Sequence, residues 1–204
     1  MNVDTTRYDQ TGRTRQKART REALLTATGA FLDEGVSPTV EQAADRAGVS
    51  RTTAYRYFPN QRVLLAAIEP DLDATSLLGP DAPDDVQARL AKTLDRYLEQ
   101  LVRREAAQRT QLRLSLESRR GEGDPPLPLR QGRAIGWIED ALAPLREHMT
   151  AAEIHLLALS IRATTGIESL VWLTDIAGLT RAEAIALMRN SAHTLLRAAL
   201  DASA

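Results

Sequence analysis

The chain has 204 residues and a formal net charge of −1, from 26 basic and 27 acidic side chains. It contains no cysteine, which excludes disulfides, thiolate zinc sites and cysteine nucleophiles. The N-terminal segment 1–21 is polar and does not read as a secretory signal, and Glu168 and Asp175 interrupt the best candidate for a membrane span. We therefore expect a cytoplasmic protein with no membrane partner.

The small net charge conceals an uneven distribution along the chain. Residues 1–65 hold ten basic and seven acidic side chains, whereas the remainder holds sixteen basic and twenty acidic ones. Within residues 7–21, six basic residues accompany one acid, Asp9. Such a split between the ends of a chain suggests a division of labour. We expect a flexible basic arm over residues 1–14, with Arg13, Arg15 and Lys17 directed to DNA. A solvated, disordered arm is an alternative compatible with this reading, because basic arms often order only on DNA.

Alanine and leucine recur at helical spacing along most of the chain, while aromatic and β-branched residues are too scarce for sheets. The fold class expected is all-α, with about nine helices. In the first third we predict one helix over about 15–33 and a second from a capping box at Thr39 to Gly48. A third helix is capped by Ser50 and ends near Phe58, and a fourth is capped by Asn60 and ends before Pro70.

The remaining two-thirds also alternates between helical patterns and breaks. Residues 79–83 read as a linker, and helices follow from Asp84 and over about 105–119. The run RRGEGDPPLP predicts a loop, followed by a helix over about 129–148 that is bent at Gly136 and Pro144. Capping boxes at Thr150 and Thr180 open two long helices. The domains expected are the arm (1–14), an N-terminal domain (15–68) and a larger C-terminal domain (69–204).

The stretch AGVSRTTAYRYF, residues 47–58, places a glycine corner before a short helix rich in hydrogen-bonding groups. Two helices joined by such a corner form a helix-turn-helix, in which the second helix enters the major groove of DNA. With Ala54 and Phe58 turned inward, the outward face can read bases, since arginine pairs with guanine and threonine or tyrosine contacts thymine methyls. The base contacts expected are Arg51, Thr52 and Tyr55. The phosphate contacts expected are Thr39, Ser50, Thr53, Arg56, Tyr57 and Gln61.

The block TREALLTATGAFLDEGVSPTVEQAADRAGVSRTTAYRYFPNQRVLL resembles the DNA-binding region of TetR-type transcriptional regulators over about residues 15–68. The shared pattern is Phe-x-x-x-Gly at the end of the first helix, a threonine cap, Ala-Gly-Val-Ser, and Thr-x-Tyr-x-x-Phe. The resemblance implies a dimer on a palindromic operator. It places Arg51, Thr52 and Tyr55 at bases, and Thr39, Thr53 and Tyr57 at phosphates. Two positions depart from the family: Gln61 stands where a lysine is usual, and Ala43 replaces a larger aliphatic residue.

Two long helices near the C-terminus carry apolar surfaces too broad for one neighbour, which suggests contact with a second copy of the chain. The family resemblance implies a four-helix dimer interface at the same place. The interface residues expected are Leu170, Val171, Ile185, Met188, Leu195 and Leu196.

The family resemblance also implies a small apolar or amphipathic effector bound among the middle helices. An apolar pocket with few polar groups provides both affinity and orientation. The lining residues expected are Tyr97, Arg113, Glu117, Trp137, His155, Thr165, Glu168 and Trp172. Each has a structural alternative: a tryptophan on a helical stripe is often core, and Glu168 could face Arg162.

We expect no enzyme, and therefore no catalytic residue, metal or cofactor. The three histidines, at 148, 155 and 193, share no metal-ligand spacing, and neither a phosphate loop nor a nucleophile elbow is present. The function expected is a DNA-binding transcriptional regulator, a repressor by its resemblance, released by a small-molecule effector. The alternative is an all-α small-molecule-binding or interaction module without sequence-specific DNA binding, with a helical enzyme in third place.

Overall fold

The structure is a computed structural model that describes residues 5–68, 75–117 and 132–203, with side chains from residue 14 to 202. All regular elements in these ranges are helical, so the predicted all-α class is confirmed. The α-helices are α1 (Thr5–Asp33), α2 (Val40–Ala47), α3 (Arg51–Tyr57), α4 (Gln61–Ala66), α5 (Val86–Arg103), α6 (Glu105–Leu116), α7 (Arg133–Ala141), α8 (Ala151–Thr165), α9 (Ile167–Val171) and α10 (Arg181–Ser203). A 3-10 helix, η1 (Ala143–Glu147), follows α7, and a π-helical turn, η2 (Trp172–Ile176), follows α9.

The chain divides into two compact units. The N-terminal unit comprises Met1–Pro70 and Arg113–Leu129, and the C-terminal unit comprises Asp71–Leu112 and Arg130–Ala204. The predicted boundary after residue 68 did not anticipate that the segment from Arg113 groups with the N-terminal unit. The predicted loop at 119–128 and Pro70 lie outside the described residues.

Helix α1 is longer than the sequence pattern suggested, since it begins at Thr5 and not near Arg15. Residues 5–14 contain one glycine and no proline, and a single glycine weakens a helix by only about 1 kcal/mol without ending it. The segment that we expected as a flexible arm is therefore helical from residue 5 onward.

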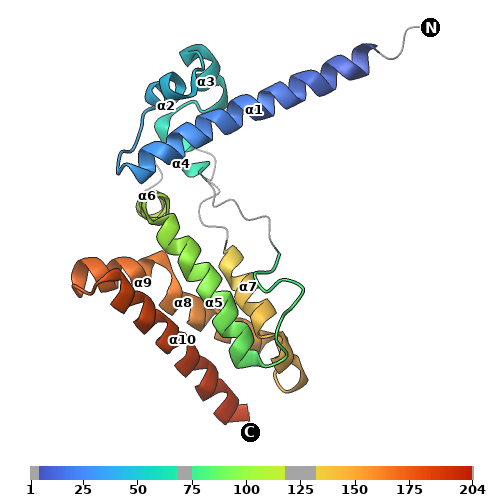
Figure 1. Ribbon diagram of the computed structural model, residues 1–204, viewed down its shortest axis with the longest axis vertical. Coiled ribbons are helices and arrows are strands. Elements are labelled where there is room, and N and C mark those ends of the chain that lie inside the picture. The colour runs from blue at the N-terminus through green and yellow to red at the C-terminus, as the bar shows by residue number, and fades with distance from the viewer. Residues whose placement is uncertain (1–4, 69–74, 118–131, 204) are drawn as a thin grey trace. The chain divides into compact units, whose positions relative to one another are not determined.

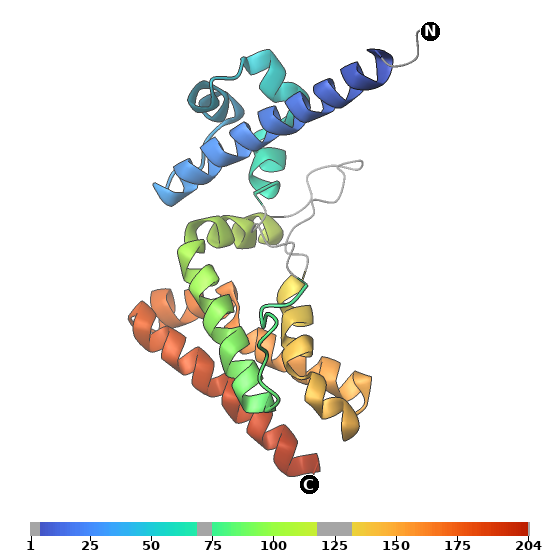
Figure 2. The same ribbon diagram turned by 45° about the vertical axis from the view of Figure 1, so that its right-hand side comes forward.

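The N-terminal unit packs α2, α3 and α4 against the C-terminal half of α1 (Figures 1 and 2). Its buried core consists of Leu24, Val40, Ala43, Ala44, Ala54, Phe58 and Leu64. Ala43 and Ala44 have no exposed surface, and their small side chains let α3 cross α2 closely. At the end of α1, the guanidinium of Arg46 stacks on Phe31 and makes two 3.0 Å hydrogen bonds to the Glu34 carboxylate.

The helix caps predicted in this unit are confirmed. The Thr39 hydroxyl accepts a hydrogen bond from the backbone amide of Gln42, whose side chain accepts one from the Thr39 amide in return. The side chains of Ser50 and Asn60 cap α3 and α4 by accepting hydrogen bonds from the backbone amides of Thr53 and Val63. Gly48 adopts a left-handed conformation with φ of 66°, and its amide donates to backbone carbonyls of α2. This corner sets the direction in which α3 leaves α2.

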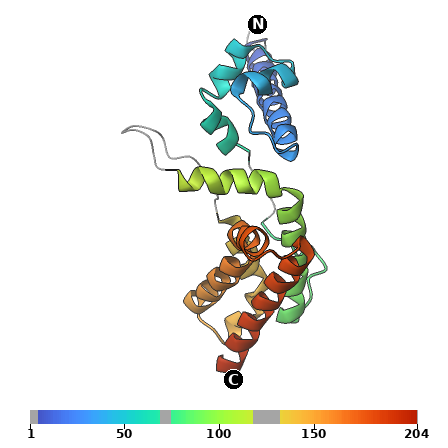
Figure 3. The same ribbon diagram turned by 90° about the vertical axis from the view of Figure 1, so that its left-hand side faces the viewer.

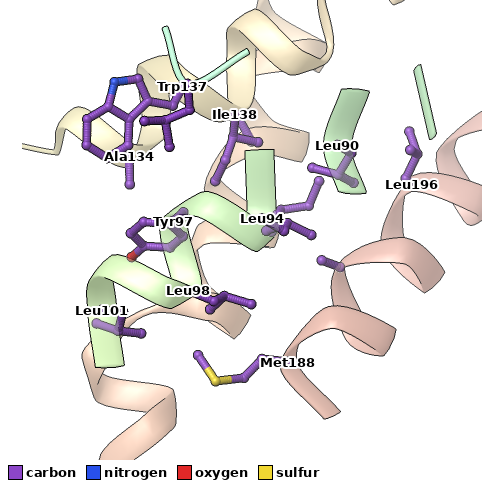
Figure 4. Close-up of a cluster of buried hydrophobic side chains, with 14 of the residues drawn as sticks. Leu90, Leu94, Tyr97, Leu98, Leu101, Ala134, Trp137, Ile138, Met188 and Leu196 are labelled. Carbon is purple, nitrogen blue, oxygen red and sulfur yellow. The ribbon is translucent and has the colours of Figure 1, made fainter. Parts of the chain in front are cut away.

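The C-terminal unit is built around a core to which α5, α7, α8, α9 and α10 contribute. Figure 4 shows Leu94, Tyr97 and Leu98 of α5 between Trp137 and Ile138 of α7 on one side and α10 on the other. Figure 3 shows α6 changing direction sharply from α5, where the helical run is interrupted by a single turn residue, Arg104.

The long helix predicted from Thr150 is divided at Gly166, whose backbone is extended, into α8 and α9. A Cβ built on Gly166 would collide with the Arg162 guanidinium, so the bare backbone makes room for that side chain. The helix predicted over 129–148 changes to the 3-10 helix η1 at Pro144, which lacks an amide donor, while α7 continues through Gly136. These breaks divide two of the predicted helices into shorter elements.

The segment Ala151–Ile176 is long and apolar enough, by length and composition alone, to cross a membrane. This corrects the expectation that Glu168 and Asp175 would exclude such a run. However, 39% of its most apolar window is buried inside the protein, where α8 packs on α7 and α10. Core helices of globular domains pass the same test, and this segment has the contacts of one.

The left-handed corner gives a test of stability. We expect Gly48→Ala to lower the free energy of unfolding by about 1 kcal/mol, because a Cβ is strained at this φ. Urea denaturation followed by circular dichroism measures the change. Gly29→Ala is the matched control: Gly29 lies inside α1 with open space around its Cα, so alanine there should stabilise the protein by up to about 1 kcal/mol. Equal effects of the two variants would contradict the role given to the corner.

Candidate nucleic-acid interface

Helix α3 presents two different faces. Ala54 is fully buried and Phe58, directly after the helix, is 2% exposed. Arg51, Thr52 and Arg56 are exposed, and Tyr55 keeps 41% of its surface accessible although it is a large aromatic residue. The three residues predicted to contact bases are thus gathered on one accessible face of one short helix.

The hydroxyl groups predicted to contact phosphate occupy the helix starts. Thr39 and Ser50 accept hydrogen bonds from the amides of α2 and α3, and the Ser50 hydroxyl donates to the Thr53 hydroxyl. The Thr39 side chain also stabilises the charged form of Glu41 and so lowers the pKa of that carboxyl. Tyr57 is half-buried against the unit's core, with its ring centre 6.5 Å from that of Phe58. Its ring therefore has a packing role whether or not its hydroxyl meets DNA.

Gln61 is engaged within the protein. Its side-chain amide donates to the backbone carbonyls of Ser37 and Pro38, at 3.1 and 3.0 Å. These bonds tie the start of α4 to the segment that precedes α2. No local pattern predicts this contact, because it joins residues more than twenty positions apart. The glutamine that stands here, where the family usually has a lysine, thus makes two hydrogen bonds within the protein.

The exposed face of α3 lies beside acidic residues of α2. The Tyr55 hydroxyl donates a hydrogen bond to the Glu41 carboxylate, and the Arg51 guanidinium lies 3.7 Å from the Asp45 carboxylate. The bond from Tyr55 lowers the pKa of Glu41, and the same bond raises the pKa of Tyr55. The sequence analysis did not predict these two pairs. The acids are four residues apart on α2 and their partners are four residues apart on α3, and this matching spacing was the one signal in the sequence.

The basic residues of the arm lie on α1. The side chains of Arg15 and Lys17 are exposed, whereas Arg13 lies in the helix with its side chain outside the described part. These residues are therefore carried on a helical scaffold.

The comparisons with known proteins agree with this geometry. Residues 23–68 match the family model described as bacterial regulatory proteins, tetR family. The sequence of residues 23–68 is therefore similar to the DNA-binding region of that family. The match contains α2, α3 and α4 and the second part of α1, so the predicted family resemblance is confirmed. No curated protein sequence matches the chain significantly.

Two solved structures show that the similarity in fold extends over most of the chain. One is a TetR transcriptional regulator from Rhodococcus sp. RHA1, with 18% identity and a TM-score of 0.63 over 89% of this chain and 97% of that one. The other is a SmeT–triclosan complex, with 24% identity and a TM-score of 0.55 over 88% of this chain and 90% of that one. At these identities the likeness concerns the fold. The likeness in fold therefore includes the helical C-terminal unit.

The structure brings only part of the predicted effector pocket together. Tyr97 and Trp137 lie in the core of the C-terminal unit with ring centres 6.3 Å apart, and the Arg162 guanidinium is 6.0 Å from the Tyr97 ring centre. Thr165 is fully buried and donates to the Ile161 carbonyl. Tyr97, Trp137 and Thr165 are thus all buried in the C-terminal unit.

The other predicted pocket residues are at the surface. His155 pairs with Glu139 at 2.5 Å, Glu168 lies 3.4 Å from Arg162, and Trp172 is 56% exposed. Arg113 and Glu117 belong to the N-terminal unit and pair with each other at 2.5 Å. None of these five is buried in the core that holds Tyr97.

The predicted dimer residues point mainly into the protein. Leu170, Met188 and Leu196 are buried in the core of the C-terminal unit. Val171, Ile185 and Leu195 are partly buried against it. Different apolar side chains are exposed on these elements, namely Leu156, Leu159, Trp172, Ile176 and Leu187. Because α8 and α10 are apolar on more than one face, the periodicity did not distinguish the inner face from the outer one.

An ion-pair network joins α6 to η2 and to the first residue of α10. Glu105 accepts hydrogen bonds from Arg109 at 2.7 Å and from Arg181 at 2.6 Å, and Arg109 also bonds to Asp175. Burial alone raises the pKa of Glu105, but the bonds from the two guanidinium groups outweigh it and the net shift is downward. The bonds from Arg109 and Thr174 hold the pKa of Asp175 at about 2.

Among the described residues, no group of three or more potential metal ligands lies together.

The Asp175 carboxylate predicts a specific pH dependence. Its folded-state pKa, about 2, lies below the ordinary value of 3.8, so its contribution to stability is present above pH 4 and disappears as the pH falls toward 2. We expect Asp175→Asn to lower the melting temperature at pH 7 and to flatten its decline in this window. Asp201→Asn, at an exposed residue near the end of α10, is the control. Parallel melting curves for parent and D175N across the window would contradict the prediction.

Proposed function

We propose that this chain is a cytoplasmic DNA-binding transcriptional repressor, which binds a palindromic operator as a dimer and is released by a small-molecule effector. The observation that carries the proposal is the two-faced helix α3. It buries Ala54 and leaves Arg51, Thr52 and Tyr55 exposed, after a corner whose geometry Gly48 fixes. A helix held only for packing would have no need of these groups on its outer face.

The exposed side chains have the chemistry that base reading requires. A guanidinium can donate two hydrogen bonds to guanine, and a threonine methyl or tyrosine ring can contact the methyl group of thymine. The hydroxyls of Thr39, Ser50 and Thr53 and the first amides of α2 and α3 suit phosphate oxygens on either side. Arg15 and Lys17 add positive charge from α1. Binding should weaken steeply as salt rises, because phosphate contacts release counterions.

The short length of α3 is the reason to propose a dimer. One helix as short as α3 contacts few base pairs, and two copies about 34–36 Å apart would read successive major grooves of a palindrome. The exposed leucines 156, 159 and 187, on α8 and α10, provide an apolar surface for the second copy.

The effector proposal rests on the core of the C-terminal unit. The Tyr97 and Trp137 rings give an apolar wall, with the Arg162 guanidinium nearby as a polar group that could orient a ligand. One solved structure of similar fold is a complex with triclosan, a small molecule. That complex supports a ligand-binding role for the fold and leaves the effector of this chain to be identified.

The reading of bases by α3 predicts different effects for two neighbouring arginines. We expect Arg51→Ala to weaken binding to a selected operator about 10- to 100-fold, since a lost arginine–base contact costs about 1–3 kcal/mol, with little change on random duplex. Arg56→Ala should weaken both duplexes to a similar extent and reduce the salt dependence. Gel shift on duplexes that the parent protein selects from a randomised library measures this.

The same assay tests the remaining parts of the proposal. Footprinting of the selected duplex should show a protected two-fold site. Compounds that raise the protein's melting temperature should release it from that duplex. If the parent protein selects no sequence at low ionic strength, the chain is a binding module without sequence-specific DNA recognition. If R51A and R56A change the affinities for the operator and the random duplex to the same extent, α3 does not recognise the bases.

The dimer surface gives a separate prediction. We expect Leu156→Glu to convert the protein to monomers in sedimentation at micromolar concentration, because the charge would be buried in the interface. Leu156 is 62% exposed within one chain, so the variant should fold. Val36→Glu, at another exposed apolar residue, is the control and should leave the dimer intact. A monomeric parent protein, or a dimeric L156E, would remove this surface from the proposal.

A further inference from the structure

Two acidic residues of α2 lie alongside the reading face of α3. Glu41 and Asp45 are one turn apart on α2, and their partners Tyr55 and Arg51 are one turn apart on α3. The two rows run in opposite directions, so the first acid meets the later residue of α3. Arg56, on the same helix, is exposed, and it has no ion pair among the described residues. The two acids thus contact two of the three predicted base-contacting residues, Tyr55 and Arg51. They do not pair with Arg56, which is predicted to contact phosphate.

This placement is unfavourable for general attraction to DNA. In a helix-turn-helix the first helix crosses the phosphate backbone, so a carboxylate near the start of α2 approaches negative charge. Glu41 is half-buried, and its carboxylate accepts a hydrogen bond from the Tyr55 hydroxyl, while the Thr39 side chain also stabilises its charged form. A residue whose charge opposes non-specific binding, and which bonds to a base-reading residue, has a feature that affinity alone does not explain.

We propose that Glu41 is a specificity-determining residue, which holds the Tyr55 side chain in its base-reading position and opposes docking on non-cognate DNA by its charge. The inference rests on the proposed function, since it assigns to Glu41 a role in sequence selection by α3. Glu41 is a positioning residue: it acts on the bases through Tyr55. Specificity is a difference between two affinities, so a group that weakens the wrong complex contributes as much as one that strengthens the right complex.

The orientation step follows from the geometry of a tyrosine side chain. Its position is set by two torsions, and its exposed ring could otherwise occupy several rotamers. A hydrogen bond from the hydroxyl to a carboxylate on a neighbouring helix fixes the far end of the ring, so less conformational entropy is lost when the ring meets a thymine methyl. The operator complex keeps this bond. On a non-cognate duplex the ring finds no methyl, and the carboxylate charge remains opposed to the phosphates.

Two substitutions at position 41 separate the two effects. Glu41→Gln removes the charge and keeps an oxygen that accepts a hydrogen bond, whereas Glu41→Ala removes both. On random duplex at low ionic strength, we expect both variants to bind about two- to fivefold more tightly than the parent, a gain that disappears at high salt. The ratio of operator affinity to random-duplex affinity should fall in both, and further in E41A than in E41Q.

A double-mutant cycle tests whether Glu41 acts through Tyr55. Tyr55→Phe keeps the ring and removes the hydroxyl, and it should lower operator affinity in the parent background. In the E41A background it should have little further effect, because the bond is already lost. Asp33→Asn is the charge control: it removes one negative charge from the exposed end of α1, away from α3, and should leave the affinity ratio unchanged.

The outcomes distinguish the inference from the function on which it rests. If the parent protein selects no duplex, the proposed function fails. If the parent is selective but E41A leaves the affinity ratio unchanged, or D33N lowers it equally, the function stands and the inference is overturned. Additive losses from E41A and Y55F would also overturn the positioning role. A titration of phenolate absorbance gives a readout without DNA: the Tyr55 signal, identified by its loss in Y55F, should appear at lower pH in E41A than in the parent.

Discussion

The N-terminal unit depends on the close approach of two short helices across a corner. Glycine at position 48 accepts the left-handed backbone that a side chain would strain, and alanines 43 and 44 leave no bulk between the helices. Because α3 has only seven residues, it is too short to be stable alone, and its packing against α2 sets its orientation. The direction in which the polar side chains of α3 point therefore depends on the small size of the α2 residues that α3 packs against.

The sequence predicted this unit well because its signals are local. Caps, a capping box and a glycine corner each involve residues within five positions of one another, and the structure contains all of them. The start of α1 was predicted less well, since no cap or proline marks where a helix of polar residues begins. The contacts of Gln61 and of Glu41 were not predicted at all. They link residues distant in sequence, and only the packing of helices brings them together.

The C-terminal unit shows the limit of periodicity in a chain rich in alanine and leucine. Leu156 and Leu157 are adjacent, yet the first is exposed and the second is buried. When apolar residues lie on several faces of a helix, the pattern identifies the helix but leaves its rotation undetermined. The residues predicted to contact a second copy lie on α9 and α10. Three of them turned out to stabilise the fold of a single chain.

The break at Gly166 has a consequence for how this chain can change. The guanidinium of Arg162 occupies the space in which any side chain at position 166 would begin, while it also approaches Tyr97. A side chain at position 166 would displace both this guanidinium, which stands beside the aromatic core, and the Glu168 carboxylate. The ion pair of Arg162 and Glu168 thus occupies the space that the glycine leaves open, and any replacement of Gly166 would act first on that pair.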